Sequence, residues 1–357
     1  MRFFLGIGFG TLVCLLMLEG LLRFLPVSSG ARMESTSIEK PFSRYLPNQH
    51  YVYSYGWALA NAKHGVTNSS GFINSSNLSG QGGVLVVGDS FIESFMLDFP
   101  ETLQGRLEQY FPGKVQAISA SGNGLADSLQ IVKYFTPNIR PSVVVLFVEA
   151  TDLSTLLEPT GKGHNGFVVN KGANISMIHN AYTESPNKVM LLRSSLARYL
   201  YYNLKFPDWT MKATKSTRRK TPVNNADNLS TKELVLNFYF SQLCLLGAEN
   251  GFRVVFLLDG DRKAIYSGNV KQIQAHDDHS LFLKLALKNG LDVVDMQPVF
   301  KRHWDQKHER MDYLPIDGHW NPVAHKLAAD EIMNILNMGV GGNGTESLVK
   351  VSADGNF

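Results

Sequence analysis

Short, mainly apolar runs separated by amphipathic stretches constrain the fold of this chain most. Five such runs occur: "VLVVG" (84–88), "VQAIS" (115–119), "SVVVLFVE" (142–149), "RVVFLL" (253–258) and "DVVDM" (292–296). Strands that are apolar on both faces belong in a parallel sheet that is covered on both sides. The stretches between them carry apolar residues at three-to-four spacing, which is typical of helices. The sequence therefore predicts a three-layer α/β/α fold around a five-stranded parallel sheet.

The N-terminal segment, 1–25, has the composition of a membrane-targeting sequence. Its residues 3–18 carry no charge, and Glu19 and Arg23 follow at a spacing that lets them pair on a helix. With that pair at the interface, the helix reaches the length of a transmembrane span, so we expect a retained N-terminal anchor. The alternative is a cleaved signal peptide, with the small residues of 27–31 near the cut. In either case the rest of the chain is expected to be exported.

The remaining chain divides by composition. Residues 26–80 lack long apolar periodicity and are rich in Ser, Asn, Gly and Tyr, which indicates a stalk and a loosely structured entry segment. The alternating pattern then fills one domain over 81–340. Within that domain, 153–231 is too long for an ordinary connection and is expected to be an insertion or cap. The tail, 341–357, is rich in turn residues and is expected to be flexible.

Charge and cysteine content exclude several classes of protein. The balance of 34 basic and 31 acidic residues gives a net charge of +3, which does not favour a nucleic-acid partner. With only Cys14 and Cys244, a disulfide framework or cysteine metal cluster is excluded. The basic run 212–220 is either a solvated loop or a contact for an anionic membrane or acidic polysaccharide. His276 and His279 have spacing that could bind zinc but lack a nearby strand end, so we expect no metal and no cofactor.

The first predicted strand ends on Gly88-Asp89-Ser90, and this triplet has two interpretations. In an open parallel sheet, ligands bind outside the carboxyl ends of the strands. Gly88 would permit a tight turn there, and the Ser90 hydroxyl would stand at the rim with its backbone N–H facing an incoming carbonyl oxygen. The triplet is also a common turn that caps a helix without any chemistry.

A serine nucleophile needs a base, and one histidine stands out for that role. The stretch "DGHWNPVAH" (317–325) puts Asp317 and His319 in a loop just after the last predicted strand, ahead of a helix opened by Asn and Pro. That loop is expected at the same edge of the sheet as Ser90. A carboxylate two residues from the histidine is close enough to orient the ring. The sequence thus favours a Ser-His-Asp arrangement.

Four blocks of the chain resemble a known family in the right order. "VLVVGDSFIES" (84–94) is similar to the first block of the SGNH (GDSL-type) hydrolases, and 317–325 resembles their last block. "ISASGNGLADSLQ" (118–130) is similar to the second block, and "VVLFVEATDL" (144–153) occupies the place of the third. The apolar N-terminus resembles the membrane-anchored bacterial branch of this family. The resemblance covers about residues 10–340 and implies the flavodoxin-like SGNH hydrolase fold.

The resemblance assigns catalytic roles to three residues. Ser90 would be the nucleophile, His319 the general base and then acid, and Asp317 the carboxylate that orients the histidine. Asp317 stands two residues before His319, where many members have three. The shorter spacing is similar to that of the alginate O-acetylation proteins, which act on exopolysaccharides outside the inner membrane.

The resemblance also implies an oxyanion hole, which differs here in one member. The backbone N–H groups of Ser90 and Gly122 would supply two donors. The third donor in the family is an asparagine side chain, and this chain has Thr151 at that position. The Thr151 hydroxyl or the neighbouring Asn123 side chain are the two candidates for the missing donor.

Three functions remain open from the sequence. The first is an exported serine esterase that removes acyl groups, O-acetyl above all, from a carbohydrate or another small ester. The second is an O-acyltransferase that uses the same triad on an exopolysaccharide or cell-envelope glycan, with partners in its biosynthesis. The third is a non-catalytic carbohydrate-binding or assembly protein on the same fold. The expected location is the inner membrane, single-pass with the domain in the periplasm, or alternatively secreted.

Overall fold

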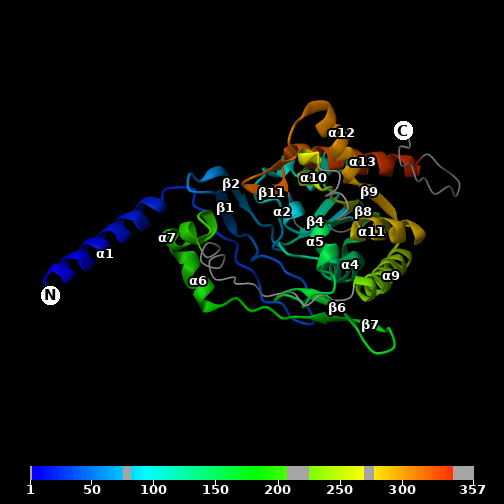
Figure 1. The fold of residues 1–357 in the computed structure, drawn as a ribbon, viewed down its shortest axis with the longest axis horizontal. Coiled ribbons are helices and arrows are strands. Elements are labelled where there is room, and N and C mark those ends of the chain that lie inside the picture. The colour runs from blue at the N-terminus through cyan, green and yellow to red at the C-terminus, as the bar shows by residue number, and fades with distance from the viewer. Residues whose placement is uncertain (1, 75–81, 207–224, 269–276, 341–357) are drawn as a thin grey trace.

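A computed structural model describes residues 2–74, 82–206, 225–268 and 277–340, and its centre is one parallel sheet (Figure 1). The strands, in the order in which they lie in the sheet, are β4 (Val115–Ser119), β3 (Val84–Gly88), β5 (Val143–Val148), β8 (Arg253–Leu258) and β9 (Asp292–Asp295). The predicted five-stranded parallel sheet is confirmed. β3 is the first of these strands along the chain, and it lies in the sheet between the second, β4, and the third, β5. This order is flavodoxin-like, and the direction in which successive strands are added to the sheet reverses at β3.

Helices cover both faces of the sheet, so the predicted three-layer α/β/α fold is confirmed. Along β3, Leu85 and Val87 belong to one buried core, and Val84 and Val86 belong to the other. This division follows from the alternation of side chains along a strand. The first core is closed by α4 (Leu125–Ile139), α9 (Asn225–Asn250) and α11 (Asp277–Lys288). The second core is closed by α3 (Leu103–Glu108), α12 (Met296–Lys307) and α13 (Pro322–Val340).

The N-terminal helix α1 (Arg2–Leu22) projects away from the sheet (Figure 1). Among the described residues, Phe3–Leu22 is the candidate membrane span, with a mean hydropathy of 2.0 and almost no burial. A helix of this length and composition satisfies the requirement for an anchor, and a signal sequence satisfies it equally.

The segment after α1 differs from the expected loosely structured entry segment. Its described part, 26–74, packs on the domain, and Phe42 and Phe72 are buried in the same core as α4. It also forms an antiparallel hairpin of β1 (His50–Tyr55) and β2 (Ala60–Val66). The sequence did not reveal this packing because its aromatic residues are buried singly and without period. Residues 75–81 lie outside the described part.

The connection between β5 and β8 forms small elements that run along the edge of the domain (Figure 1). In chain order they are α5 (Ala150–Ser154), β6 (Asn165–Val169), β7 (Ile175–His179), α6 (Pro186–Arg193), α7 (Ser195–Arg198) and the π-helical turn η2 (Tyr199–Asn203). The basic run 212–220 and the expected flexible tail, 341–357, lie outside the described residues. The remaining short elements are α2 (Ser90–Glu93), η1 (Phe99–Glu101), α10 (Arg262–Ser267), β10 (Asp312–Tyr313) and β11 (Asp317–Trp320).

Candidate active site

The turn after β3 places Ser90 at the carboxyl end of that strand, which lies between β4 and β5. Gly88 is needed there for close approach, because a Cβ on it would lie 2.4 Å from Ile92 Cγ1. Asp89 then caps α2, with Oδ1 accepting from the Phe91 N–H at 2.8 Å. Ser90 is the first residue of that helix. The turn is therefore fixed by packing on one side and by a cap on the other.

Three of the predicted site residues meet in one hydrogen-bonded chain. His319 Nε2 lies 2.8 Å from Ser90 Oγ, and His319 Nδ1 lies 2.5 Å from Asp317 Oδ1. The His319 backbone N–H also donates to Asp317 Oδ1, at 3.0 Å. The expectation that Asp317 and His319 lie in a loop just after the last strand of the sheet is wrong, because α12 follows that strand. They instead lie on β11, which pairs with β10 in a short antiparallel hairpin.

Tyr53, from strand β1, completes the surroundings of Asp317. Its hydroxyl donates to Asp317 Oδ2 at 2.8 Å, whereas His319 bonds the other carboxylate oxygen, Oδ1. Burial by itself would raise the pKa of Asp317, but its hydrogen bonds to the His319 side chain and backbone, the His319 charge and the Tyr53 hydroxyl hold that pKa well below its usual range. Asp317 is therefore held as a carboxylate. The sequence carried no signal for Tyr53 beyond the tyrosine content of its segment.

A buried carboxyl group, Glu93, links three segments beside the triad. Glu93 is 1% exposed, accepts from the Tyr45 hydroxyl, and accepts from Ser121 Oγ at 2.6 Å. Burial raises its pKa to about 7, against the opposing effect of the Ser121 and Tyr45 hydrogen bonds and the His319 charge. Glu93 thereby ties the helix that begins at Ser90 to the loop after β4 and to the N-terminal segment. Nothing in the sequence pattern pointed to it.

Two backbone donors of the predicted oxyanion hole follow neighbouring strands. Gly122 follows β4 with a φ of +85°, a conformation that favours glycine. No hydrogen bond from the N–H of Ser90 or of Gly122 to another described residue is present. Neither N–H is therefore engaged by another described residue, and their role as oxyanion donors stays a prediction.

The two candidates for the third donor are engaged elsewhere. Thr151 is exposed, and its hydroxyl donates to the Glu149 carboxylate. The Asn123 side-chain amide donates to the Gly88 carbonyl at 3.1 Å, and Asn123 is buried. No hydrogen bond in the described part of the chain joins either side chain to Ser90. The structure therefore brings Ser90, His319 and Asp317 together and leaves Thr151 and Asn123 outside that chain of contacts.

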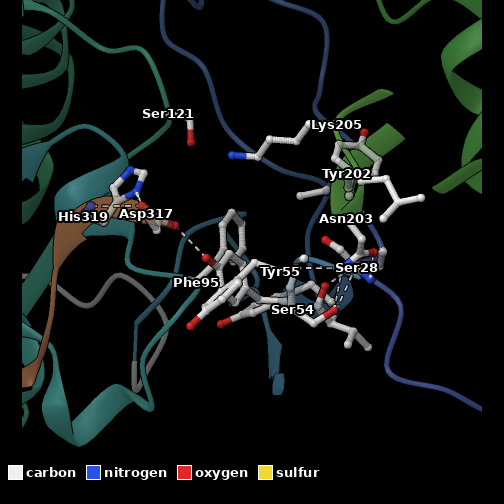
Figure 2. A pocket seen from close by; sticks show the side chains of 18 of the residues that line it. Ser28, Ser54, Tyr55, Phe95, Ser121, Tyr202, Asn203, Lys205, Asp317 and His319 are labelled. Atoms are coloured by element: carbon white, nitrogen blue, oxygen red, sulfur yellow. Dashed lines mark hydrogen bonds and ion pairs between the residues drawn. The ribbon is translucent and has the colours of Figure 1, made fainter. Parts of the chain in front are cut away.

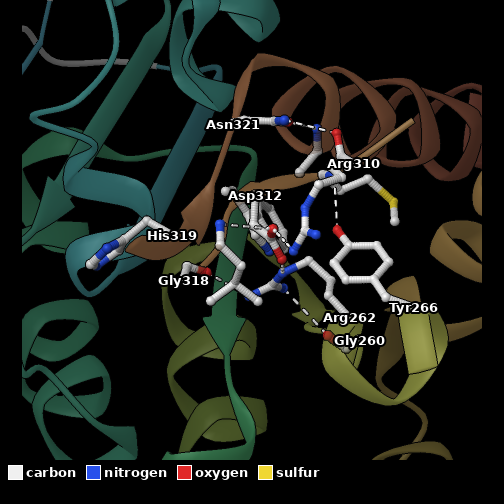
Figure 3. Close-up of polar contacts among 12 residues, drawn as sticks. Gly260, Arg262, Tyr266, Arg310, Asp312, Gly318, His319 and Asn321 are labelled. Atoms are coloured by element: carbon white, nitrogen blue, oxygen red, sulfur yellow. Dashed lines mark hydrogen bonds and ion pairs between the residues drawn. The ribbon is translucent and has the colours of Figure 1, made fainter. Parts of the chain in front are cut away.

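A buried arginine holds the hairpin that carries His319 (Figure 3). Arg262 donates to Asp259 Oδ2 at 2.7 Å and to the Gly318 carbonyl at 3.0 Å, and it forms an ion pair with Asp312 at 3.3 Å. Asp259 also accepts from Trp320 Nε1 at 2.9 Å. Because Asp312, Gly318 and Trp320 all belong to the β10–β11 hairpin, these contacts fix its position against α10.

A cavity of about 570 Å³ opens beside the triad (Figure 2). Ser121, Asp317 and His319 line one end of it. Six aromatic side chains also line the cavity, together with small residues, other apolar side chains and two lysines; the aromatic ones are Tyr45, Tyr51, Tyr53, Tyr55, Phe95 and Tyr202, and the lysines are Lys188 and Lys205. Aromatic faces and hydroxyls together suit a ligand that has apolar faces and many polar groups.

The histidines considered for zinc do not form a recognisable metal site in the described chain. His279 Nε2 lies 3.3 Å from Asp295 Oδ2, and His276 lies outside the described residues. Among the residues that the structure describes, no group of three His, Cys, Asp or Glu side chains could hold a metal ion.

The fold defines a three-layer α/β/α protein with a flavodoxin-like parallel sheet, and the β10–β11 hairpin carries two of its candidate site residues. Residues 242–350 match the family model described as "SGNH hydrolase-like domain, acetyltransferase AlgX". The matched part contains β8, β9 and the hairpin with Asp317 and His319, whereas Ser90 lies before it. This match confirms the resemblance to SGNH hydrolases and to the proteins of alginate O-acetylation for residues 242–350.

Solved structures with a similar fold include several hydrolases. LAE5, an α/β hydrolase from the metagenome of Lake Arreo in Spain, is 11% identical over 72% of this chain and 96% of that chain, with a TM-score of 0.41. The acetyl xylan esterase AlAXEase is 13% identical over 71% and 99%, with a TM-score of 0.42. A lipolytic G-D-S-L family protein from Veillonella parvula is 8% identical over 72% and 99%, with a TM-score of 0.37. The comparison with curated proteins finds no match.

Proposed function

We propose that this protein is an exported serine esterase that removes acyl groups, O-acetyl above all, from a carbohydrate or another small ester. The observation that carries the proposal is the hydrogen-bonded chain from Ser90 through His319 to Asp317 at the carboxyl end of β3. A serine becomes a nucleophile when a histidine takes its proton and a carboxylate orients that histidine.

The proposed reaction proceeds through an acyl-enzyme. Ser90 Oγ attacks the ester carbonyl carbon while His319 Nε2 takes the hydroxyl proton, and the negative oxygen is held by the N–H groups of Ser90 and Gly122. The carbon–oxygen bond to the alcohol breaks, and His319 gives its proton to the departing oxygen. A water molecule then attacks the acyl-enzyme, loses its proton to His319 and releases the acid. His319 returns that proton to Ser90.

An O-acyltransferase is the second candidate, in which a sugar hydroxyl takes the place of water. Two observations favour it: the matching family model is that of an acetyltransferase, and the aromatic cavity beside His319 offers a binding site for an acceptor. In this alternative, His319 deprotonates the acceptor hydroxyl and the acyl group passes to the glycan. An exopolysaccharide or cell-envelope glycan, and partners in its biosynthesis, are the corresponding expectations.

The N-terminal helix α1 bears on where the protein is located. We propose that α1 is a retained, single-pass anchor in the inner membrane and that the domain lies in the periplasm. The hydropathy and length of Phe3–Leu22 support this location. A secreted form would require cleavage after α1.

The function is tested with chromogenic acetyl and butyryl esters, using the purified full chain. We expect hydrolysis by the wild type and a loss of activity of about 10³-fold or more in Ser90→Ala and His319→Ala. The control Ser35→Ala, at an exposed serine, should keep the wild-type activity. Comparing acetate release with acetylation of an oligosaccharide separates the esterase from the transferase. If the folded wild type neither hydrolyses nor transfers, the non-catalytic alternative is favoured and the proposal is wrong.

A further inference from the structure

The charged end of α1 is bound to the domain rather than free. Glu19 accepts three hydrogen bonds at the start of α7: from Ser194 Oγ at 2.8 Å, from the Ser195 N–H at 3.1 Å and from the Leu196 N–H at 2.8 Å. It also pairs with Arg23 at 2.9 Å. Three donors to one carboxylate, two of them backbone, fix the direction in which α1 leaves the domain.

The length of α1 sets the depth of this contact. The uncharged residues 3–18 rise about 24 Å at 1.5 Å per residue, whereas the hydrocarbon core of a bilayer is about 30 Å thick. A spanning α1 must therefore use its last turns, up to Leu22, to reach the bilayer surface. Because the start of α7 is bonded to Glu19, less than one turn before Leu22, it then lies at the boundary between the hydrocarbon core and the headgroups.

Exposed apolar side chains gather on the elements around the base of α1, where Figure 1 places α6, α7 and the β1–β2 hairpin. Trp57, in the turn of that hairpin, is 78% exposed, and its carbonyl accepts from the Tyr199 hydroxyl of η2 at 2.8 Å. The membrane-proximal face is defined here by Phe24, Trp57, Met190, Leu200, Tyr201 and Phe206, all of which are exposed. Three exposed basic side chains accompany it: Arg23, Arg193 and Lys205.

We propose that the membrane-proximal face lies on the bilayer that α1 enters, with its aromatic and apolar side chains among the headgroups and its basic side chains against anionic phospholipids. The inference rests on the proposed anchor. Aromatic rings and basic residues are the side chains that proteins place at this depth. The continuity of the face with α1, through Glu19 and α7, identifies the occupant as the bilayer.

This placement has a consequence for the active site. The cavity is lined at one end by Asp317 and His319 and elsewhere by Ser28, Tyr55 and Tyr202 (Figure 2). The latter three come from the segment after α1, the hairpin and η2, which are the elements of the membrane-proximal face. The cavity that reaches Asp317 and His319 is therefore built in part from the elements of the membrane-proximal face.

The docking is tested by tryptophan quenching in vesicles of phosphatidylglycerol and phosphatidylcholine that hold the full chain. Lipids brominated near the headgroup should quench the tryptophan fluorescence of the wild type more than that of Trp57→Phe. The difference between the two is the contribution of Trp57. Trp57 is exposed, so the substitution leaves the core intact. In the Trp57→Phe background, Leu245→Trp on α9, at the opposite end of the molecule in Figure 1, serves as the matched reporter and should gain no quenching.

The outcomes separate this inference from the proposed function. Selective quenching of Trp57 that weakens when phosphatidylglycerol is replaced by phosphatidylcholine supports docking on an anionic surface. Equal quenching of the wild type and Trp57→Phe overturns it, even where ester hydrolysis is retained in the same vesicles. If the protein recovered from the cells has lost α1 by cleavage, the docking inference is also overturned. Loss of hydrolysis with Trp57 still quenched would instead contradict the esterase.

Discussion

At the scale of single residues, the hydrogen bond from Tyr53 to Asp317 can be tested most directly. The Tyr53 hydroxyl donates to Asp317 Oδ2 at 2.8 Å, whereas His319 bonds Oδ1. A hydrogen bond to a charged group contributes about 1.5–3 kcal/mol, so Tyr53→Phe should lower kcat about tenfold or more by loosening Asp317. Steady-state ester hydrolysis measures this, with Tyr55→Phe as the matched control from the same cavity. Equal kcat values for the two variants would contradict the positioning role of Tyr53.

Glu93 carries a pH-dependent prediction for stability. Its folded pKa is about 7, above the ordinary 4.5, because the side chain is buried. Between these values the folded state keeps a proton that the unfolded state has released, so stability is full below pH 4.5 and falls as the pH rises toward 7. The loss amounts to about 3 kcal/mol, and Glu93→Gln should remove it. Urea unfolding of both proteins at pH 5 and pH 8 measures the difference; the same pH slope for both would contradict it.

The sequence predicts one group of site residues and misses another for a physical reason. Ser90, Asp317 and His319 could be predicted because each follows a local pattern, a strand end or a D-x-H stretch beside a helix cap. Tyr53 and Glu93 could not, since each acts through a contact with a distant segment and has no motif of its own. A buried glutamate three residues after the serine reads as an ordinary helix residue until its partners are seen.

At the scale of elements, the β10–β11 hairpin depends on one buried cation. Arg262 is 9% exposed and faces Asp259 and Asp312. Because Arg262→Ala leaves buried Asp259 without its cation and Asp312 with Arg310 alone, it should lower the free energy of unfolding by about 3–5 kcal/mol. Lys263→Ala, at the exposed neighbour, should change it by less than about 0.5 kcal/mol. Urea unfolding of the two variants compares them directly, and similar values would rule out this role for Arg262.

The elements that the sequence predicts well are those buried on both faces. The runs around Val86 and Val145 are wholly apolar because helices cover both sides of the sheet, and that pattern has no competing explanation. The N-terminal hairpin is half-exposed, and Phe42 and Phe72 fill the core from irregular backbone. Such packing leaves no period in the sequence, so the sequence predicts only a loosely structured segment there.

At the scale of the whole molecule, the anchor joins the fold to the membrane. The contacts of Glu19 with α7 are made by a residue that a signal peptidase would remove. We therefore expect the mature protein to retain residues 1–25 and to stay in the membrane pellet after alkaline extraction. Intact-mass measurement and fractionation test this expectation. A soluble protein that begins after residue 25 would contradict the anchor while leaving the esterase proposal in place.

The central claim is that Ser90 is a nucleophile activated by His319. A fluorophosphonate reacts covalently with such serines, and peptide mass spectrometry locates the label. The account predicts labelling of the wild type on the peptide that contains Ser90, no label there in Ser90→Ala, and labelling slowed by about 10³-fold or more in His319→Ala. A folded wild type that takes up no label, or takes it up on another serine, would contradict the account.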